Sequence, residues 1–147
     1  MPTLFPPDPL TGSKGASGSG CEPGAGDLPS GVWFGYVRQA NASGIAFDLA
    51  CFFFGDAAYV EGGADGVEVD DDYYVRNVNP TLRSVAVPSA ATVHHIDATG
   101  DLGFMAVQFA DWPPPGFSYI PCPGDFCGVW LYVNGGTVTE IVEQYVP

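Results

Sequence analysis

The sequence predicts a mainly β fold: a small antiparallel barrel or sandwich of seven to eight short strands with one short helix. Three observations support this prediction. Short runs of β-branched and aromatic residues recur between clusters of Gly, Pro, Asn and Asp. Residues 45–51 alternate large apolar side chains with small or polar ones, the period of two that a strand requires. Asn134-Gly135 stands between two β-branched runs, as a tight hairpin turn requires.

The elements follow one another with turn residues between them. Asn41 to Gly44 forms the turn of a first hairpin, Asn79-Pro80 turns the chain, and the segment from Asp111 to Gly116 interrupts regular structure. We expect one helix over 56–61, with Asp56 as its N-cap and Gly62-Gly63 at its end. Strands are expected over 33–38, 45–51, 73–77, 83–87, 92–97, 104–109, 129–133 and 137–143.

The chain divides into a leader over residues 1–30 and a single β-rich domain over residues 31–147. The leader is rich in Pro, Gly and Ser, a composition that buries too little surface to offset its ordering entropy, so we expect a flexible tether. It shows neither the basic region nor the apolar run of a secretory signal peptide. The remaining length suits one hydrophobic core.

The charge balance excludes several classes of partner. The 147 residues include 17 acidic and 4 basic side chains, a formal net charge of −13. Nucleic-acid binding and docking on anionic lipid both need a cationic surface, so we expect neither. No apolar run is long enough for a transmembrane segment. We also expect no cofactor, because no motif for one is present.

Four cysteines suggest a disulfide-permissive compartment, and therefore an extracellular or cell-surface location. Cys122 and Cys127 flank a short loop of turn residues, which makes a local bridge easy. Cys21 would then pair with Cys51, although four cysteines allow three connectivities and only proximity favours this one. A zinc site is the alternative, but the spacing lacks the usual C-x2-C pairs.

Two clusters of titratable residues have plainer explanations than a metal or catalytic site. His94 and His95 are neighbours on a strand and face opposite sides, so we expect packing or surface roles. The acidic run lacks the spacing of a calcium loop and is interpreted as solvated. We therefore predict no metal site and no catalytic residue. The run contains Asp65, Glu68, Asp70, Asp71 and Asp72.

Asp48 interrupts an otherwise apolar strand and must find a partner if its face is buried. We predict that it pairs with Arg38, Arg76 or Arg83, the arginines of the folded domain. Asp48 and Asp72 are also the candidates for acid-base chemistry if the protein is a small hydrolase.

The densest polar and aromatic stretch, residues 72–83, is the predicted contact surface. Tyrosine rings offer stacking faces and arginines offer forked donors, which suits a sugar, a carboxylate or a protein partner. The alternative is an ordinary strand and turn. The candidate ligand-binding residues are Asp48, Asp72, Tyr73, Tyr74, Arg76, Asn77, Asn79 and Arg83.

Several short segments form a combination that is typical of one group of proteins. They are 47–50 (Phe-Asp-Leu-Ala), 55–58 (Gly-Asp-Ala-Ala), 72–77 (Asp-Tyr-Tyr-Val-Arg-Asn) with Asn79-Pro80 and Leu82-Arg83, and 143–147 (Glu-Gln-Tyr-Val-Pro). Together they resemble a group of uncharacterised exported proteins and lipoproteins of high-GC Gram-positive bacteria. The resemblance implies export and a shared fold, and it assigns no catalytic residue. The missing signal peptide departs from that pattern.

The leading functional hypothesis is an exported or surface-tethered, non-enzymatic β domain that binds a small ligand or a protein partner. A small hydrolase using Asp or Glu is the second hypothesis. A calcium-dependent binding module using the loop around Asp70 is the third.

Overall fold

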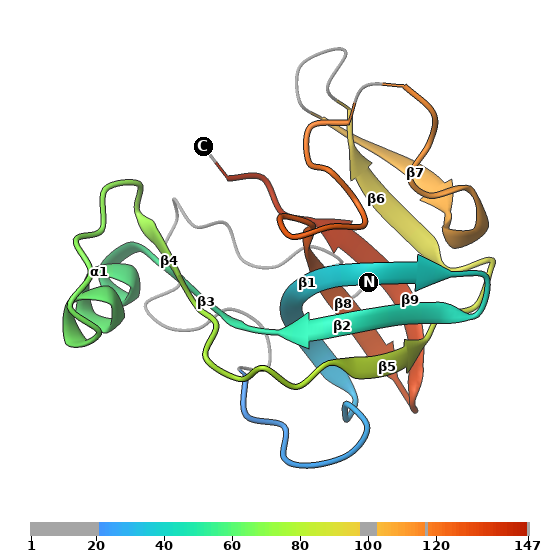
Figure 1. Ribbon diagram of the computed structural model, residues 1–147. Coiled ribbons are helices and arrows are strands. Elements are labelled where there is room, and N and C mark those ends of the chain that lie inside the picture. Colours follow the sequence, from blue (N-terminus) through green and yellow to red (C-terminus); the bar gives the residue numbers. More distant parts are fainter. Residues whose placement is uncertain (1–20, 98–102, 117, 147) are drawn as a thin grey trace.

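The computed structural model describes residues 21–97, 103–116 and 118–146, and the structural statements below refer to these residues (Figure 1). The described residues form nine strands, one α-helix and one short 3-10 helix. In order they are β1 (Gly31–Asn41), β2 (Gly44–Leu49), β3 (Cys51–Phe54), α1 (Gly55–Ala64), β4 (Tyr73–Arg76), β5 (Arg83–Ala86), β6 (Thr92–Ile96), β7 (Phe104–Gln108), η1 (Phe109–Asp111), β8 (Gly128–Asn134) and β9 (Thr137–Glu143).

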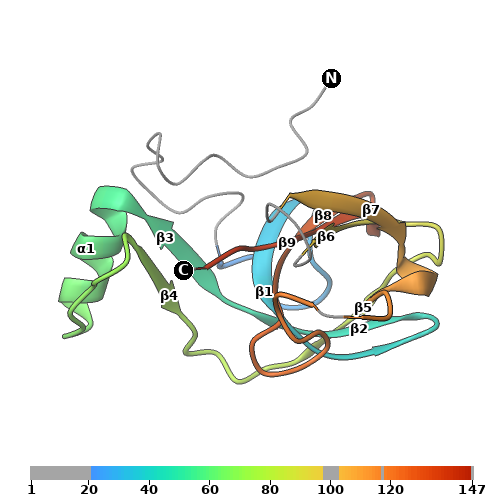
Figure 2. The same cartoon turned by 90° about the horizontal axis from the view of Figure 1, so that it is seen from above.

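Seven strands form one sheet in the order β5-β2-β1-β8-β9-β6-β7, and β3 and β4 form a separate two-stranded ribbon. Seen from above, the large sheet curls around an interior while the ribbon and α1 project from it (Figure 2). The predicted mainly β fold with one α-helix is confirmed. The sheet ends at β5 and β7 without closing into a barrel, so its form is sandwich-like.

Two details of the sheet differ from the prediction. The strand expected over 45–51 divides at Ala50: β2 stays in the large sheet, and β3 leaves it to pair with β4. The strands were expected to be antiparallel throughout, but β6 and β9 are parallel. Parallel pairing needs a long crossover connection, and here β7, η1, β8 and the segments that join them lie between the paired strands.

Apolar side chains form three successive cores. The curled sheet encloses the first, which contains Phe47, Leu131 and Ile141. The second lies between the outer face of β1 and β8 and one face of the ribbon, where Trp130 meets Phe52. The third lies between the other face of the ribbon and α1, and includes Cys21 with Cys51, Phe53 and Ala58. Side chains of β3 alternate between the two faces of the ribbon, so this one strand supplies apolar side chains to both the second and the third core.

The helix is longer than expected. Its N-cap position is Phe54, without a side-chain cap, so the predicted cap by Asp56 is wrong; Asp56 lies in the first turn. The expected end at Gly62-Gly63 is also wrong, because both glycines lie inside a helix that continues to Ala64. Gly62 serves packing: a Cβ placed there would lie 2.4 Å from Cγ2 of Val69.

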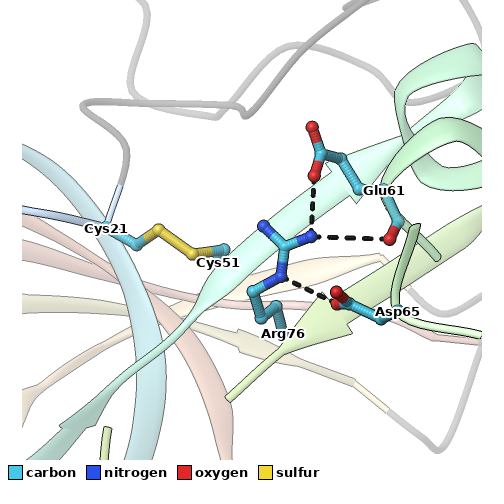
Figure 3. The surroundings of a disulfide bond; sticks show 5 residues. All are labelled: Cys21, Cys51, Glu61, Asp65 and Arg76. Carbon is cyan, nitrogen blue, oxygen red and sulfur yellow. Dashed lines mark hydrogen bonds and ion pairs between the residues drawn. A yellow bond between two sulfur atoms is a disulfide. The ribbon is translucent and has the colours of Figure 1, made fainter. Parts of the chain in front are cut away.

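Both predicted disulfides are confirmed. Cys21–Cys51 joins the start of the described chain to β3 (Figure 3), and Cys122–Cys127 closes the loop before β8. Residues 1–20 of the expected leader lie outside the described residues, whereas Leu28 is buried in the first core. No helix in the described part of the chain is long and apolar enough to cross a membrane.

Candidate functional site

A groove of about 290 Å³ lies where the ribbon meets the outer face of the large sheet. We call it the aromatic groove, because five of its nine lining residues carry aromatic rings. β1, the ribbon, the loop before β8 and the C-terminal segment all contribute. The lining residues are Phe34, Tyr36, Phe52, Tyr73, Val75, Phe126, Gly128, Gln144 and Val146.

Strand pairing sets the positions of the groove residues. Phe34 and Tyr36 are two residues apart on β1 and share its outer face, and Tyr36 is paired in register with Gly128 of β8. Gly128 leaves room beside them, because a Cβ there would lie 3.1 Å from Cζ of Phe34. On the ribbon, the ring of Tyr73 stacks on Phe52, with centroids 5.5 Å apart. These contacts hold the walls in a fixed geometry.

Phe126 forms the exposed rim of the aromatic groove, with 75% of its surface exposed. It lies in the short loop closed by the Cys122–Cys127 disulfide. That loop is held to β1, because the backbone N–H of Val37 donates to the carbonyl of Cys127 at 2.9 Å. An exposed ring on a cross-linked loop offers contact area with little conformational entropy to lose on binding.

The described residues that line the groove carry no charged side chain, and two phenol hydroxyls are their side-chain polar groups without a partner. No partner of the Tyr36 or Tyr73 hydroxyl is found among the described residues. The amide of Gln144 is engaged: Trp130 Nε1 donates to its Oε1 at 2.6 Å, and its Nε2 donates to the carbonyl of Tyr145 at 2.7 Å. Burial raises the pKa of the Tyr36 hydroxyl above 10.0, and the nearby Arg38 guanidinium partly offsets that rise.

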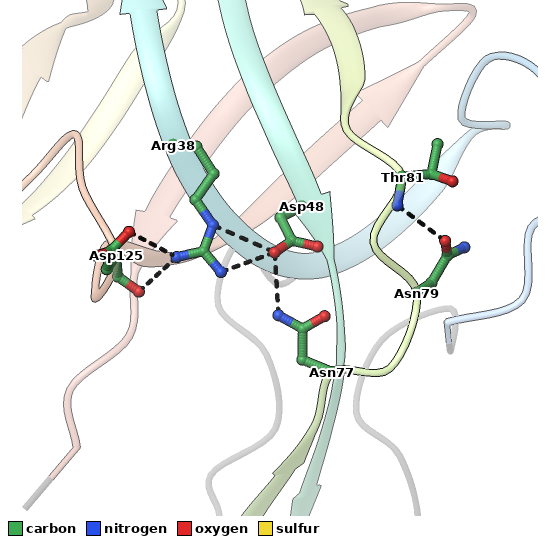
Figure 4. Close-up of polar contacts among 6 residues, drawn as sticks. All are labelled: Arg38, Asp48, Asn77, Asn79, Thr81 and Asp125. Atoms are coloured by element: carbon green, nitrogen blue, oxygen red, sulfur yellow. Dashed lines mark hydrogen bonds and ion pairs between the residues drawn. The ribbon is translucent and has the colours of Figure 1, made fainter.

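A charged cluster lies beside the groove, on β1 and β2 (Figure 4). Arg38 Nη2 lies 2.7 Å from Oδ2 of Asp48, which confirms the predicted Asp–Arg pair. Asn77 Nδ2 donates to the same oxygen at 3.1 Å, and Arg38 Nη1 lies 3.5 Å from Oδ1 of the exposed Asp125. The Arg38 guanidinium also lies 4.9 Å from the ring centroid of Tyr36, which links this cluster to the groove.

A second ionic cluster joins the ribbon to α1 (Figure 3). Arg76 Nη2 lies 2.7 Å from Oε2 of Glu61, and its Nε lies 2.8 Å from Oδ2 of Asp65. Tyr74 donates its hydroxyl to the same Asp65 oxygen. The hydrogen bond from Arg76 is the main reason that the pKa of Asp65 falls below 3.8, and the Asp65 and Glu61 carboxylates raise the pKa of Arg76. The Arg76 guanidinium is therefore engaged in contacts that hold the ribbon against α1.

The predicted contact residues over 72–83 therefore do not form one surface. Tyr73 packs toward the sheet and lines the aromatic groove, while Tyr74 packs on the opposite face, stacked on Phe53. Asn79 accepts the backbone N–H of Thr81 in the turn (Figure 4), and Arg83 donates to the carbonyl of Gly24. Of the eight candidates, Tyr73 alone lines the groove, and Asp48 and Asn77 adjoin it through Arg38.

The two candidate acids for a hydrolase lie apart. Asp72 precedes β4 and accepts the hydroxyl of Tyr59, while Asp48 contacts Asn77, which follows β4. Four strand residues span about 13 Å. The paired carboxylates of glycoside hydrolases lie within about 10 Å of each other. The structure therefore does not bring Asp48 and Asp72 together as an acid-base pair.

The histidines pair with glutamates of β9. His94 Nε2 lies 2.7 Å from Oε2 of Glu140, and the buried His95 Nδ1 lies 2.8 Å from Oε2 of the buried Glu143. Their opposite directions along β6 and their packing roles agree with the prediction. Within the described ranges, no three His, Cys, Asp or Glu side chains are grouped so that they could hold a metal ion.

Sequence reasoning missed most of the aromatic groove. Tyr36, Phe126, Gly128 and Gln144 come from segments up to 108 positions apart in the chain, and only the fold brings them together. The one local signal was Phe126, a large apolar residue inside a short disulfide loop. No protein-family model, curated protein or solved structure matches this chain.

Proposed function

We propose that the protein is a non-enzymatic binding domain, exported or tethered at a cell surface, and that the aromatic groove is its ligand site. One observation carries the proposal: aromatic rings from four separate segments converge on one concave site. The described residues that line this site carry no charged side chain and include two tyrosine hydroxyls without a partner among the described residues. Aromatic side chains are typical anchors of binding sites, because they offer a large rigid contact area, and tyrosine adds a polar tip.

The surroundings of the groove also support binding over catalysis. Asp48 is 7% exposed and is held by Arg38 and Asn77, and the buried Glu143 is held by three donors. A general acid or base must come within hydrogen-bond reach of its substrate. Neither carboxylate lines the groove, so its lining supplies shape, apolar surface and two hydroxyls.

The two disulfides support export, because such bonds persist mainly in oxidising compartments. Quantitative thiol titration of the protein isolated from its native source tests this part of the proposal. We expect no free thiol without a reductant. Four titratable thiols per chain would contradict export.

The binding proposal is tested with three neutral or cationic probes: maltotriose, choline and a proline-rich decapeptide. Each is titrated into the full ¹⁵N-labelled chain. We expect at least one probe to shift the amide resonances of Phe126 and Gly128, and Phe126→Ser to weaken that binding about tenfold, as loss of an aromatic anchor does. Phe104→Ser removes an exposed phenylalanine outside the groove and should leave the affinity unchanged. The absence of shifts with all three probes, or equal weakening by both substitutions, would contradict the proposal.

A further inference from the structure

The polar groups of the aromatic groove select among ligand classes. This step rests on the proposed function, because it takes the groove as a binding site. A saccharide carries many hydroxyls that each need a partner once buried. Among the described residues, the side chains of the groove offer two hydroxyls without a partner, those of Tyr36 and Tyr73. A quaternary ammonium ligand suits aromatic walls, but the positive Arg38 guanidinium already lies over the Tyr36 ring. A ligand without positive charge, with a large apolar surface and a few acceptors, remains.

An extended proline-rich peptide has those properties. In the polyproline II conformation its rings are apolar, and its carbonyls point outward as acceptors without internal partners. Aromatic-lined grooves bind such peptides at low entropic cost, because the peptide is already extended. The stacked Phe52–Tyr73 pair and the exposed Phe126 ring supply such walls, and the tyrosine hydroxyls can donate to peptide carbonyls.

The chain itself carries such a peptide. Residues 4–10 read Leu-Phe-Pro-Pro-Asp-Pro-Leu, with three prolines between apolar residues and one acidic side chain. Their connection to the domain is fixed at a known point, because Cys21 is bonded to Cys51, the residue before Phe52 of the groove.

The length of the leader allows residues 4–10 to reach the groove. Eleven peptide units separate residue 10 from Cys21, which span up to about 36 Å when extended. Cys21 packs on the face of the ribbon opposite to Phe52. The ribbon is two strands wide, which is about 10 Å. The extended length of residues 10–21 is therefore greater than the distance around the edge of the ribbon to the groove. A tether of this length gives an effective concentration on the order of millimolar.

We infer that the aromatic groove is a proline-rich peptide site and that residues 4–10 of the same chain occupy it. A peptide from another molecule then has to displace this internal segment. The leader thus lowers the apparent affinity of the domain for external ligands to the intrinsic affinity multiplied by the fraction of time that the groove is empty.

The test uses the full chain with P6S/P7S/P9S and a synthetic peptide of residues 2–11. We expect the resonances of Phe126 and Gly128 to differ between this variant and the wild-type chain, independently of protein concentration. The peptide should bind the variant about tenfold or more tightly than it binds the wild type. The matched leader variant S13A/S17A/S19A should behave as wild type, and F126S added to P6S/P7S/P9S should weaken peptide binding.

Several results would overturn the inference. The whole inference is contradicted if the groove resonances are identical in the wild type and in P6S/P7S/P9S and the peptide binds to neither chain. Equal affinity of the peptide for the two chains would contradict occupancy of the groove by residues 4–10 of the same chain. Groove shifts that grow with protein concentration would show that residues 4–10 bind to the groove of a second copy. If choline or maltotriose binds in a manner that F126S weakens while the peptide does not bind, the proposed function stands and this inference fails.

Discussion

The imidazole Nδ1 of His95 lies 2.8 Å from Oε2 of Glu143, and both side chains are buried where β6 and β9 run in parallel. Trp112 Nε1 donates to the same oxygen at 2.7 Å, and the backbone N–H of Ile96 donates to Oε1 at 2.8 Å. Because the indole and backbone N–H groups can only donate, both carboxylate oxygens act as acceptors. Glu143 therefore joins β6, β9 and the segment after η1 at one buried point.

Glu143→Gln should destabilise the protein strongly. The amide offers one acceptor oxygen and one NH2 group, so at least one of the three donors would face another donor in a buried site. Leaving a buried polar group unpaired lowers the free energy of unfolding by about 1–3 kcal/mol. We expect a loss of about 2–3 kcal/mol in urea unfolding monitored by tryptophan fluorescence.

Glu140→Gln is the matched control, because Glu140 pairs with the neighbouring His94 but is partly exposed. A partly exposed pair contributes about 1 kcal/mol or less. Similar losses in the free energy of unfolding for Glu143→Gln and Glu140→Gln would contradict the role of Glu143 as a buried acceptor for three groups.

Asp48 and Asp125 both contact Arg38, but their burial differs. Asp48 has 11% of its side chain exposed and Asp125 has 89%. Asp48→Asn weakens a buried, charge-assisted contact to Arg38 and disturbs the bond from Asn77, so we expect a loss of about 1–3 kcal/mol. Asp125→Asn should cost less than about 0.5 kcal/mol. Denaturant unfolding of both variants at neutral pH makes the comparison, and equal effects would contradict a structural role for the buried pair.

Local patterns predicted the parts of the fold that local physics determines. Asn134-Gly135 marked the β8–β9 hairpin because a tight turn needs positive φ, and Gly135 has φ of 59°. The pairing of Asp48 with an arginine followed from the cost of burying an unpaired charge. The parallel pairing of β6 with β9 depends on how a long connection crosses the molecule. No local residue pattern encodes that path.

The candidate site was predicted less completely for the same reason. Tyr73 was identified as part of an aromatic, polar segment, but period-two alternation sends the adjacent Tyr74 to the opposite face of the ribbon. Treating residues 72–83 as one surface ignored this alternation. Tyr36 and Phe126 reach the groove through the sheet and the disulfide loop, so their proximity to Tyr73 exists only in the folded chain.

The two adjacent glycines of α1 should respond oppositely to alanine. A Cβ on Gly62 would lie 2.4 Å from Val69 Cγ2, whereas a Cβ on Gly63 would meet nothing within 4 Å. Gly62→Ala should therefore destabilise the protein by about 1–3 kcal/mol through overpacking. Gly63→Ala should stabilise it by up to about 1 kcal/mol through helix propensity. Thermal unfolding of the two variants measures the difference; a gain from Gly62→Ala would contradict the packing role.

The two disulfides should differ in their contribution to stability. Cys21–Cys51 closes a loop with a sequence separation of 30, and Cys122–Cys127 one of 5. Loop-closure entropy in the unfolded chain gives contributions of about 4 and about 2 kcal/mol, respectively. Paired substitutions to serine, C21S/C51S and C122S/C127S, compared by urea unfolding, test the order. A larger loss from C122S/C127S would show that contacts of the short loop outweigh chain entropy.

The Asp65–Arg76 pair predicts a pH dependence with a defined sign. The pKa of Asp65 is lowered from 3.8, mainly by the hydrogen bond from Arg76 and then by that from Tyr74. A carboxyl group with a lower pKa in the folded state stabilises the fold at pH values above its unfolded pKa. That stabilisation is lost as the pH falls through the folded value. NMR titration of the Asp65 side chain should give a pKa below 3.8 in the wild type and a higher pKa in Arg76→Gln. Tyr74→Phe should raise the pKa less, because it removes the smaller of the two hydrogen-bond effects. The stability difference between wild type and Arg76→Gln should also narrow as the solution is acidified below pH about 4, where Asp65 becomes protonated in both.

An Asp65 pKa that Arg76→Gln leaves unchanged would mean that the ion pair between the ribbon and α1 does not persist in solution.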